Sequence, residues 1–386
     1  MRFSEVLGNI KLKKQLINSV QHNRIAHAQM FLGEKSSPKL LLALSYAKYI
    51  NCKNKSSDDS CGRCSSCIKY QNLTHPDLHL VFPVLLIKNI KKATSDDFIR
   101  EWREGVLKNP FIDLSVWFET FSNENKTGKT GHIYTQEIES LNKKLLLKHY
   151  ESEFRVVLIW LPENMQASTS NKLLKLLEEP PKKTIFLLVS ENSDLILKTI
   201  ISRVQIIKIP NYNSIEIEDF LNSKFPSRSG EEIKKMISVT GGNTALSVQM
   251  LQNDSFENKN FEEYQNWMRL CYSSNIIEIT KWVNQRAAKG RRNHSIFLLY
   301  SLKMIRNCLV FQFFDKNKLF ITENEKIFLT KFHPFVHENN IIQITQLLEE
   351  SIKNIERNAN PKIIFYELSL QFMKLLKVNR KFVEIN

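Results

Sequence analysis

Residues 31–52 read FLGEKSSPKLLLALSYAKYINC, an apolar strand followed by a Gly, a polar loop and an apolar helix. This order matches a phosphate-binding loop, whose pattern is G-x-x-x-x-G-K-[ST]. Gly33 and Lys39 stand where the pattern needs them, but Pro38 replaces the second Gly and Leu40 replaces the hydroxyl residue. The stretch predicts the α/β scaffold of a nucleotide site and leaves open whether nucleotide binds there.

Further strand and helix patterns extend outward from this stretch. Apolar runs bounded by turn residues lie at 28–33, 78–84, 155–160, 184–190 and 204–210. Continuous apolar runs are typical of strands buried on both faces of a parallel sheet. Helical patterns separate them, notably at 39–50, 136–149 and 167–178. The alternation predicts an α/β core with a parallel sheet and helices on both faces.

After residue 210 the patterns become helical. We expect a core at 1–210, a small helical segment at 211–255 and an all-α domain at 256–386. In the last helical pattern Asn360 is a favourable N-cap and Pro361 suits the first helical position. Cys271 and Cys308 lie in these helical patterns and are interpreted as small buried hydrophobes.

Residues 86–135 interrupt the core with an insert. It contains an amphipathic helix at about 96–107 and the aromatic residues Phe111, Trp117, Phe118 and Phe121. One interpretation is a segment that contacts nucleic acid through Lys and aromatic side chains. The favoured interpretation is a loop whose aromatic rings pack on its own domain, because base stacking needs exposed rings in a basic groove.

The composition is that of a basic globular chain. Its 386 residues are 42% hydrophobic and 25% charged, with a net charge of +15 and a pI near 9.4. The charge favours an anionic partner such as nucleic acid, or it reflects a Lys-rich, AT-rich genome. Without an apolar run of about 18 residues or a signal-peptide pattern, we expect a cytoplasmic chain that does not span a membrane.

Four of the six cysteines lie within sixteen residues, as Cys52, Cys61, Cys64 and Cys67. Pairs two residues apart let the sulfurs turn toward one ion, and Gly62 relaxes the backbone between them. Four thiolates form a closed tetrahedral shell, so the spacing favours structural Zn²⁺ over an iron–sulfur cluster or four free thiols. We predict a small zinc module after the helix that follows the loop.

Several blocks in one order carry a family resemblance. RIAHAQMFLGEKSSPK at 24–39, the four-cysteine insert, HPDLHLV at 75–81, NKLLKLLEEPPKKTIFLLVSE at 171–191 and TIISRVQ at 199–205 stand in that order. Together they resemble the bacterial clamp-loader AAA+ subunits of DNA polymerase III, the gamma/tau and delta-prime family. The resemblance covers essentially the whole chain and implies an AAA+ core, a lid and a helical collar.

Members of the family differ in whether they hydrolyse ATP, and the loop argues against hydrolysis here. Pro38 removes a backbone N–H that would face phosphate, and Glu34 adds negative charge beside it. Leu40 lacks the hydroxyl that holds Mg²⁺. Lys39 remains, but we interpret it as a solvated lysine at a helix start.

Two other motifs agree. Where the resemblance implies an Asp-Glu pair after strand 155–160, the chain has Trp160 and Leu161, and Glu163 is offset from the strand end. Where the lid of an active member has a nucleotide-sensing Arg, the chain has Thr244. We therefore predict that the chain does not hydrolyse ATP and does not bind it tightly.

Ser202 and Arg203 match the Ser-Arg-Cys motif of the family, with Val204 in place of Cys. The resemblance implies that Arg203 reaches the γ-phosphate bound by a neighbouring subunit, as an arginine finger in trans. The alternative is an ordinary surface Arg in a turn.

The resemblance thus implies a non-hydrolysing delta-prime (stator) subunit in a hetero-pentamer with gamma/tau and delta. Through that complex it would help load a sliding clamp onto primed DNA. A gamma/tau-type ATPase motor and a zinc-stabilised DNA-binding protein outside replication are the alternatives. The motor needs an intact loop and carboxylate pair, and the DNA-binding protein would bind primed DNA by itself with steep salt dependence.

Overall fold

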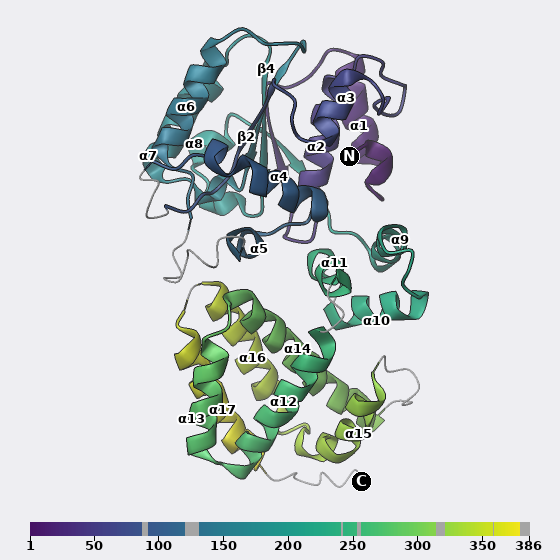
Figure 1. Cartoon of the computed structure of the whole chain (residues 1–386), viewed down its shortest axis with the longest axis vertical. Helices are drawn as coiled ribbons and strands as arrows, with labels where there is room; N and C mark the ends of the chain where they lie inside the picture. Colours follow the sequence, from purple (N-terminus) through teal and green to yellow (C-terminus); the bar gives the residue numbers. More distant parts are fainter. Residues whose placement is uncertain are drawn as a thin grey trace. The chain divides into compact units, whose positions relative to one another are not determined.

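The computed structural model describes residues 1–86, 92–119, 131–240, 242–252, 256–313, 321–357 and 359–378 (Figure 1). The chain divides into two compact units, Met1–Ser223 and Lys224–Asn386. The division between them falls inside the segment 211–255, and the three-part division at 210 and 255 stays a prediction. The first unit holds the sheet, and the described part of the second is helical.

The sheet has five parallel strands in the order β2-β3-β4-β1-β5. Their bounds are β1 Ala28–Leu32, β2 Leu78–Val81, β3 Arg155–Trp160, β4 Thr184–Ser190 and β5 Gln205–Lys208. Leu32 is level with Ser190 and Lys208, and Trp160 is level with Val189, so the strands end at a common edge. The predicted parallel α/β core is confirmed.

Helices cover both faces of this sheet. Figure 1 shows α6 and α7 on one side and α1 and α2 on the other. The helices of the first unit are α1 Ile10–Gln21, α2 Lys39–Ile50, α3 Ser65–Gln71, α4 Ile99–Lys108, α5 Leu114–Glu119, α6 Thr135–Leu146, α7 Ala167–Glu178, α8 Lys198–Ile201 and α9 Ser214–Lys224. Four 3₁₀ turns accompany the described helices, at Phe3–Glu5, Ser95–Phe98, Pro162–Asn164 and Ser193–Leu195.

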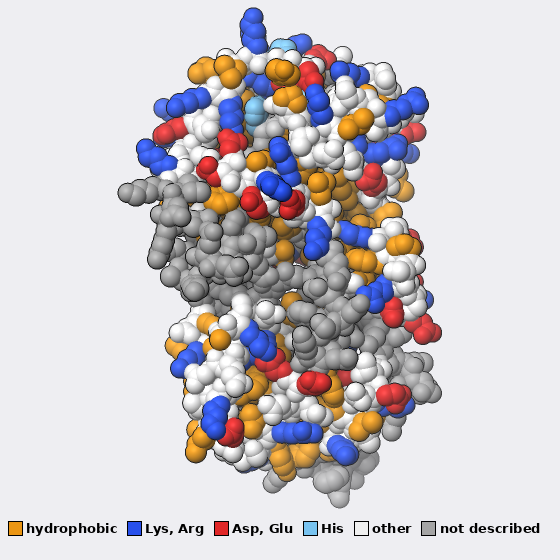
Figure 2. Space-filling model, viewed as in Figure 1, with side chains coloured by type: hydrophobic (Ala, Val, Ile, Leu, Met, Phe, Trp, Pro, Cys, Tyr) orange, Lys and Arg blue, Asp and Glu red, His pale blue; other side chains and the backbone are white. Residues whose placement is uncertain are grey.

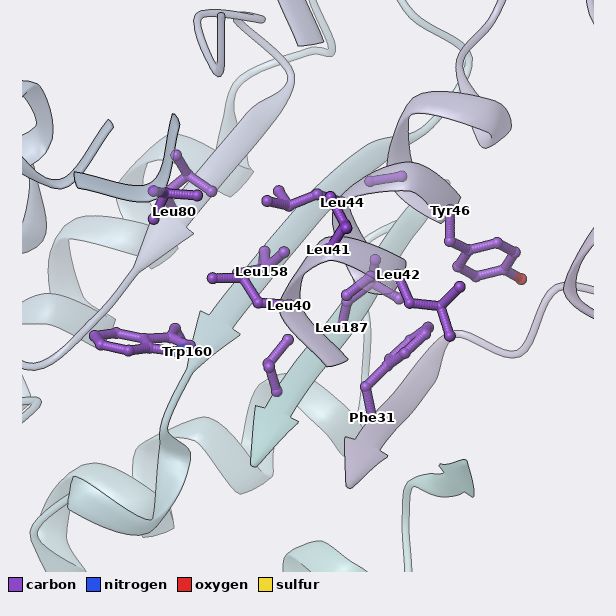
Figure 3. Close-up of a cluster of buried hydrophobic side chains, with 14 of the residues drawn as sticks. Phe31, Leu40, Leu41, Leu42, Leu44, Tyr46, Leu80, Leu158, Trp160 and Leu187 are labelled. Atoms are coloured by element: carbon purple, nitrogen blue, oxygen red, sulfur yellow. The ribbon is translucent and has the colours of Figure 1, made fainter. Parts of the chain in front are cut away.

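Adjacent residues of each central strand serve opposite cores, because side chains alternate along a strand. Leu158 and Leu187 join the cluster that α2 covers, together with Phe31 (Figure 3). Val157 and Leu188 belong to the cluster beneath α6 and α7. The continuous apolar runs of these strands follow from this burial on two faces. The expectation of double burial is wrong for β5, whose edge position leaves Ile206 exposed.

The described part of the insert packs on its own unit. Trp117 is buried, and its indole N–H donates to the carbonyl of Pro83 at 2.7 Å. Phe111 is buried against Tyr212 and Phe220, with ring centroids 6.0 and 5.2 Å away. These positions support the packing interpretation over base stacking. Phe121 lies outside the described residues.

The second unit is a helical bundle around its own aromatic core. Its helices are α10 Gly230–Thr240, α11 Thr244–Gln252, α12 Phe256–Ser273, α13 Ile276–Ala287, α14 Arg291–Phe313, α15 Glu323–Phe332, α16 Ile341–Glu356 and α17 Pro361–Leu375, with a 3₁₀ turn at His333–Phe335. Trp267 stacks on Trp282 at 5.4 Å in the core. Asn360 caps α17 through the N–H of Lys362, as predicted.

Both cysteines of this unit are buried. Cys271 and Cys308 belong to its hydrophobic core, which agrees with their interpretation as small hydrophobes. Among the described residues, none of the helices has the length and apolar character that crossing a membrane requires.

Candidate functional site

The carboxyl edge of the sheet brings together most of the residues singled out for nucleotide chemistry. Gly33 follows β1, Trp160 ends β3, and Glu191 follows β4. Ligands of open parallel sheets bind in crevices at this edge, beside the helix N-termini. Whether the edge can accept nucleotide therefore depends on what these residues contact.

The loop between β1 and α2 is hydrogen-bonded to itself. The carbonyl of Glu34 accepts from the Ser37 N–H at 3.0 Å, the Ser37 hydroxyl at 2.9 Å and the Lys39 ammonium at 2.7 Å. A Cβ at Gly33 would come within 2.3 Å of the Ser37 Oγ, so the loop leaves no space there. Pro38 occupies the N-cap of α2 and contributes no N–H donor. The Ser37 N–H and hydroxyl and the Lys39 ammonium are thus engaged within the loop instead of facing a phosphate.

Lys39 is buried and paired, so its interpretation as a solvated lysine is wrong. Its side chain is only 5% exposed, and its Nζ lies 3.3 Å from Oε1 of Glu191. Burial lowers the pKa of Lys39, and the Glu191 carboxylate opposes that shift. The positive charge that would face a phosphate is therefore balanced by a carboxylate of the same chain.

Glu163 joins the loops that follow β3 and β4. Its Oε1 accepts the backbone N–H of Glu191 at 2.7 Å and that of Asn192 at 3.3 Å. Burial raises the pKa of Glu163, although the Glu191 N–H bond opposes this. Leu161 turns the chain between β3 and Glu163 in the left-handed region, at φ 55°, and its N–H donates to the Val189 carbonyl at 2.8 Å. One oxygen of the Glu163 carboxylate thus holds the loop that follows β4.

Aromatic side chains fill the place where the resemblance implied a carboxylate pair. Trp160 is buried beside Trp102 of α4, with centroids 6.2 Å apart in an edge-on arrangement. Trp102 stacks on Phe82, just after β2, at 4.9 Å. Leu40 belongs to the same hydrophobic cluster, and Figure 3 shows it together with Trp160. Hard cations need oxygen ligands, which Leu40 and Trp160 do not supply.

Sequence reasoning missed the parts played by Phe82 and Trp102. The only local signals were an aromatic residue directly after a strand and a Trp on the apolar face of the insert helix. Neither signal says that the two rings meet.

Thr244, the predicted substitute for the sensing Arg, is buried at the start of α11 in the second unit.

The four clustered cysteines form a compact knuckle that extends from the end of α2 into the first turn of α3. The sulfurs of Cys52, Cys61, Cys64 and Cys67 all lie within 4.8 Å of one another. The Cys61 and Cys67 sulfurs are 3.9 Å apart, far longer than a disulfide bond. Gly62 adopts the left-handed conformation at φ +73°, which supports its predicted role in the turn.

Backbone donors surround these sulfurs. The Cys61 N–H donates to the Cys52 sulfur and the Cys64 N–H to the Cys61 sulfur, both at 3.3 Å. The Cys67 N–H donates to the Cys64 sulfur at 3.4 Å. Burial opposes ionisation of Cys61, but N–H donors of Arg63 and Cys64 lower its pKa to about 6. Such donors stabilise the thiolate of Cys61, whereas burial raises the pKa of Cys52 and Cys67. Four thiolates suit a tetrahedral Zn²⁺. The donor set therefore fits a structural zinc ion.

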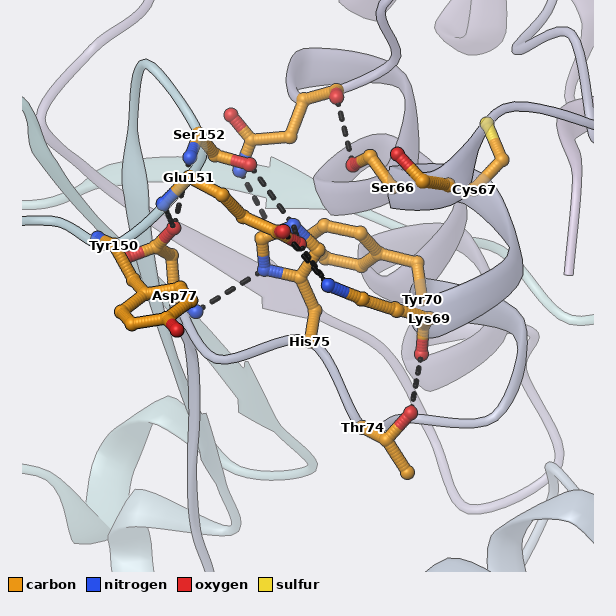
Figure 4. A network of polar contacts seen from close by, with 12 residues as sticks. Ser66, Cys67, Lys69, Tyr70, Thr74, His75, Asp77, Tyr150, Glu151 and Ser152 are labelled. Carbon is orange, nitrogen blue, oxygen red and sulfur yellow. Dashed lines mark hydrogen bonds and ion pairs between the residues drawn. The ribbon is translucent and has the colours of Figure 1, made fainter.

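A polar network anchors the cysteine module to the sheet (Figure 4). Glu151 pairs with Lys69 of α3 at 2.7 Å and with His75 at 3.1 Å. Burial lowers the pKa of His75, whose Nδ1 accepts the Asp77 N–H at 3.1 Å. The Asp77 carboxylate accepts three N–H groups from Tyr150 to Ser152. These contacts give His75 and Asp77, the first and third residues of the block HPDLHLV, a structural role that sequence reasoning did not assign.

Arg203 lies in the turn after α8, two residues before β5 begins. Its Nη1 donates to the Thr199 carbonyl at 3.0 Å and to the Ser202 hydroxyl at 3.3 Å. Its Nη2 lies 2.7 Å from Oε1 of Glu178, the last residue of α7. The Arg203 side chain is 37% exposed, so the guanidinium is reachable from outside the unit.

Basic residues do not gather in one visible groove. On the face drawn in Figure 2, Lys and Arg side chains are interspersed with Asp and Glu over both units. The net charge of +15 is consequently no pointer to a single binding surface on this face.

Comparison with known proteins settles the family. The family model described as "DNA polymerase III, delta subunit" matches residues 8–213, more than half of the chain. The chain belongs to this clamp-loader family. The sequence resemblance to clamp-loader subunits is thereby confirmed.

Individual relatives agree with this assignment. The delta′ subunit of DNA polymerase III from Bacillus subtilis is 30% identical over 246 residues, covering 64% of this chain and 60% of the relative. The tau subunit from the same organism is 26% identical, covering 53% of this chain and 28% of the relative. The chain thus spans between about a quarter and three fifths of these relatives.

A further delta′ subunit, from Pseudomonas aeruginosa, is 25% identical, covering 62% of this chain and 59% of the relative. Among solved structures, a gamma subunit-related protein from Thermotoga maritima covers 96% of this chain and is itself covered completely. Its identity is 11% and its TM-score 0.42, values too low to support any functional argument.

Proposed function

We propose that the chain is a non-hydrolysing, delta-prime-type subunit of the DNA polymerase III clamp loader. The observation that carries this proposal is the closed carboxyl edge, where Trp160 packs on Trp102 and Lys39 pairs with Glu191. Nucleotide would have to displace a buried ion pair and an aromatic cluster to bind there. The similarity to two delta′ subunits supports the same assignment.

In this role the subunit has no active site of its own and serves the ATPase subunits beside it. Its partners are gamma/tau and delta in a hetero-pentamer, with the sliding clamp and primed DNA engaged through the complex. The helices at 256–386 form the collar, and residues 211–255 form the lid. A role in chromosomal replication places the chain in the cytoplasm.

Arg203 acts as an arginine finger on the ATP of a neighbouring subunit. Its exposure and its place at a turn support this role, because a planar cation stabilises the negative charge that spreads over a transferring phosphoryl group. The four cysteines hold one structural Zn²⁺ and take no part in chemistry, because their closed shell leaves no position for water.

The proposal is tested first on the chain by itself. Titration calorimetry with Mg-ATP should give no binding, and steady-state assays should give no hydrolysis above background. Binding with a micromolar dissociation constant would overturn the proposal and favour the gamma/tau-type motor, which the 26% identity to tau keeps as the alternative.

The finger is tested in the reconstituted loader. Arg203→Ala should leave assembly intact but reduce the DNA- and clamp-stimulated ATPase rate, since fingers contribute about 10³–10⁵ in rate at a single site. Arg203→Lys should reduce the stimulated ATPase rate in the same way, because an ammonium group does not reproduce the planar, forked donor geometry of a guanidinium. Unchanged turnover and loading in a loader of verified stoichiometry would remove the finger role.

A further inference from the structure

Glu178 occupies a fixed position at the end of α7. The helix is held against the sheet by the buried residues Leu173, Leu176 and Leu177. Pro180 and Pro181 follow two and three residues later and prevent the helix from continuing. The backbone that carries the Glu178 carboxylate is therefore anchored, although the side chain itself is 41% exposed.

Arg203 is held from two sides. Helix α8 supplies the Thr199 carbonyl, its C-cap residue supplies the Ser202 hydroxyl, and α7 supplies the Glu178 carboxylate at 2.7 Å. Ser202 is itself fixed, because its hydroxyl donates to the Thr199 carbonyl at 3.0 Å. A guanidinium has five N–H donors, so these three contacts engage only part of its capacity.

Stability does not explain this arrangement well. Exposed ion pairs contribute about 0–1 kcal/mol to folding. An Arg side chain carries about 2 kcal/mol of rotamer entropy, and a catalytic group that is already ordered avoids that cost when its target arrives. The benefit of the contact is therefore expected in the reaction that Arg203 serves.

We infer that Glu178 is a positioning residue, which orients the guanidinium of Arg203 toward the phosphate of a neighbouring subunit before that subunit docks. The inference rests on the proposed finger role of Arg203. Glu178 touches neither nucleotide nor metal and acts only through the arginine. Its partner in the reaction is the polyphosphate of a nucleoside triphosphate held in trans.

The test compares Glu178→Gln with Glu179→Gln in the reconstituted loader. Glu179 is the adjacent exposed carboxylate, so this control removes the same charge one residue away. Glu178→Gln should lower the kcat of the stimulated ATPase about 5-fold, equal to about 1 kcal/mol of barrier. Its KM for ATP should stay within about 2-fold, and Glu179→Gln should match the wild type.

Two further variants distinguish positioning of Arg203 from a purely structural role of Glu178. Glu178→Asp keeps the charge and should recover part of kcat, whereas a purely structural role would not separate Asp from Gln in this way. Combined with Arg203→Ala, Glu178→Gln should add no further loss. Melting temperatures within about 2 °C and equal elution on gel filtration should show that folding and assembly are intact.

The outcomes separate this inference from the proposed function. If Arg203→Ala is slow but Glu178→Gln turns over at the wild-type rate, positioning by Glu178 is refuted and the finger role stands. A faster Glu178→Gln loader would mean that the carboxylate restrains the arginine, which also overturns the inference. An Arg203→Ala loader with normal turnover overturns both.

Discussion

Breaking the Lys39–Glu191 pair should destabilise the first unit measurably. At 3.3 Å and an effective dielectric constant of about 20, the charges attract each other by about 5 kcal/mol before desolvation is subtracted. Removing one member of a buried pair costs about 3–5 kcal/mol because the other charge is left uncompensated. Glu191→Gln keeps a polar partner and the Glu34 carbonyl stays in place, so we expect about 3 kcal/mol.

Lys39→Met leaves the remaining charge in a milder environment. The Glu191 side chain is 18% exposed, so water can partly solvate it, and we expect a loss of about 2 kcal/mol. The double variant removes both charges and should cost about 2 kcal/mol less than the sum of the two single variants. That coupling energy is the signature of a pair which stabilises the fold.

The measurement is urea unfolding of the full chain, read by amide hydrogen exchange in α2 and β4. Reading single elements is necessary because the chain has two compact units and a global signal would mix them. Lys182→Met, at an exposed lysine, is the matched control and should stay within about 0.5 kcal/mol of the wild type.

Two results would refute the reasoning. One such result is a Lys39→Met variant as stable as the wild type, or a double variant whose loss of stability equals the sum of the two single losses. Either outcome would mean that the ion pair does not hold the edge closed. If the wild type bound Mg-ATP and Lys39→Met did not, the lysine would be a phosphate ligand and the edge would be open.

Three further predictions concern metal, packing and pH. The purified chain should hold about one Zn²⁺. Cys64→Ser should lose the metal and lower the amide-exchange protection of α3, but not that of α13 or α17. A protein that is fully folded, reduced and free of metal would contradict this prediction. Trp102→Ala should cost about 3–5 kcal/mol in urea unfolding, because its fully buried ring supports Trp160, and a loss below about 1 kcal/mol would exclude that role. Burial raises the pKa of Glu137 in α6 to about 7, so the protonated residue stabilises the fold below its ordinary pKa of 4.5 and loses that contribution as pH rises through 7. Between pH 4 and pH 8 the free energy of unfolding of Glu137→Gln should therefore rise by about 3 kcal/mol relative to that of the wild type. A difference that does not change with pH would contradict the raised pKa of Glu137.

Local patterns were enough to predict much of the fold. The strand at 155–160 and the helices at 39–50 and 167–178 begin and end where the sequence places them. Their signals are contained in a few consecutive residues, such as an unbroken apolar run or the Pro180-Pro181 stop. The cysteine cluster is local in the same sense, because all four sulfurs come from sixteen residues.

Interactions between distant segments were beyond such patterns. The apolar run at 204–210 reads like a central strand, but the strand order puts it at the sheet edge. Lys39 reads like a solvated lysine because Glu191, its counter-charge, lies more than 150 residues away in the chain. Neither burial nor partner can be read from a residue's immediate neighbours.

The sequence by itself determined which side chains stand at the loop and at the end of the strand at 155–160. Pro38, Leu40, Trp160 and Leu161 each lack a group that phosphate or Mg²⁺ needs, and this is why the sequence predicts a degenerate nucleotide site. It also determined the cysteine module, whose ligand types and spacing are complete within one short segment. Only the tertiary structure decided what surrounds Trp160 and Leu40. Phe82, Trp102 and Trp160 come from three separate segments, and they meet because parallel strands end at one edge and the insert helix packs across it.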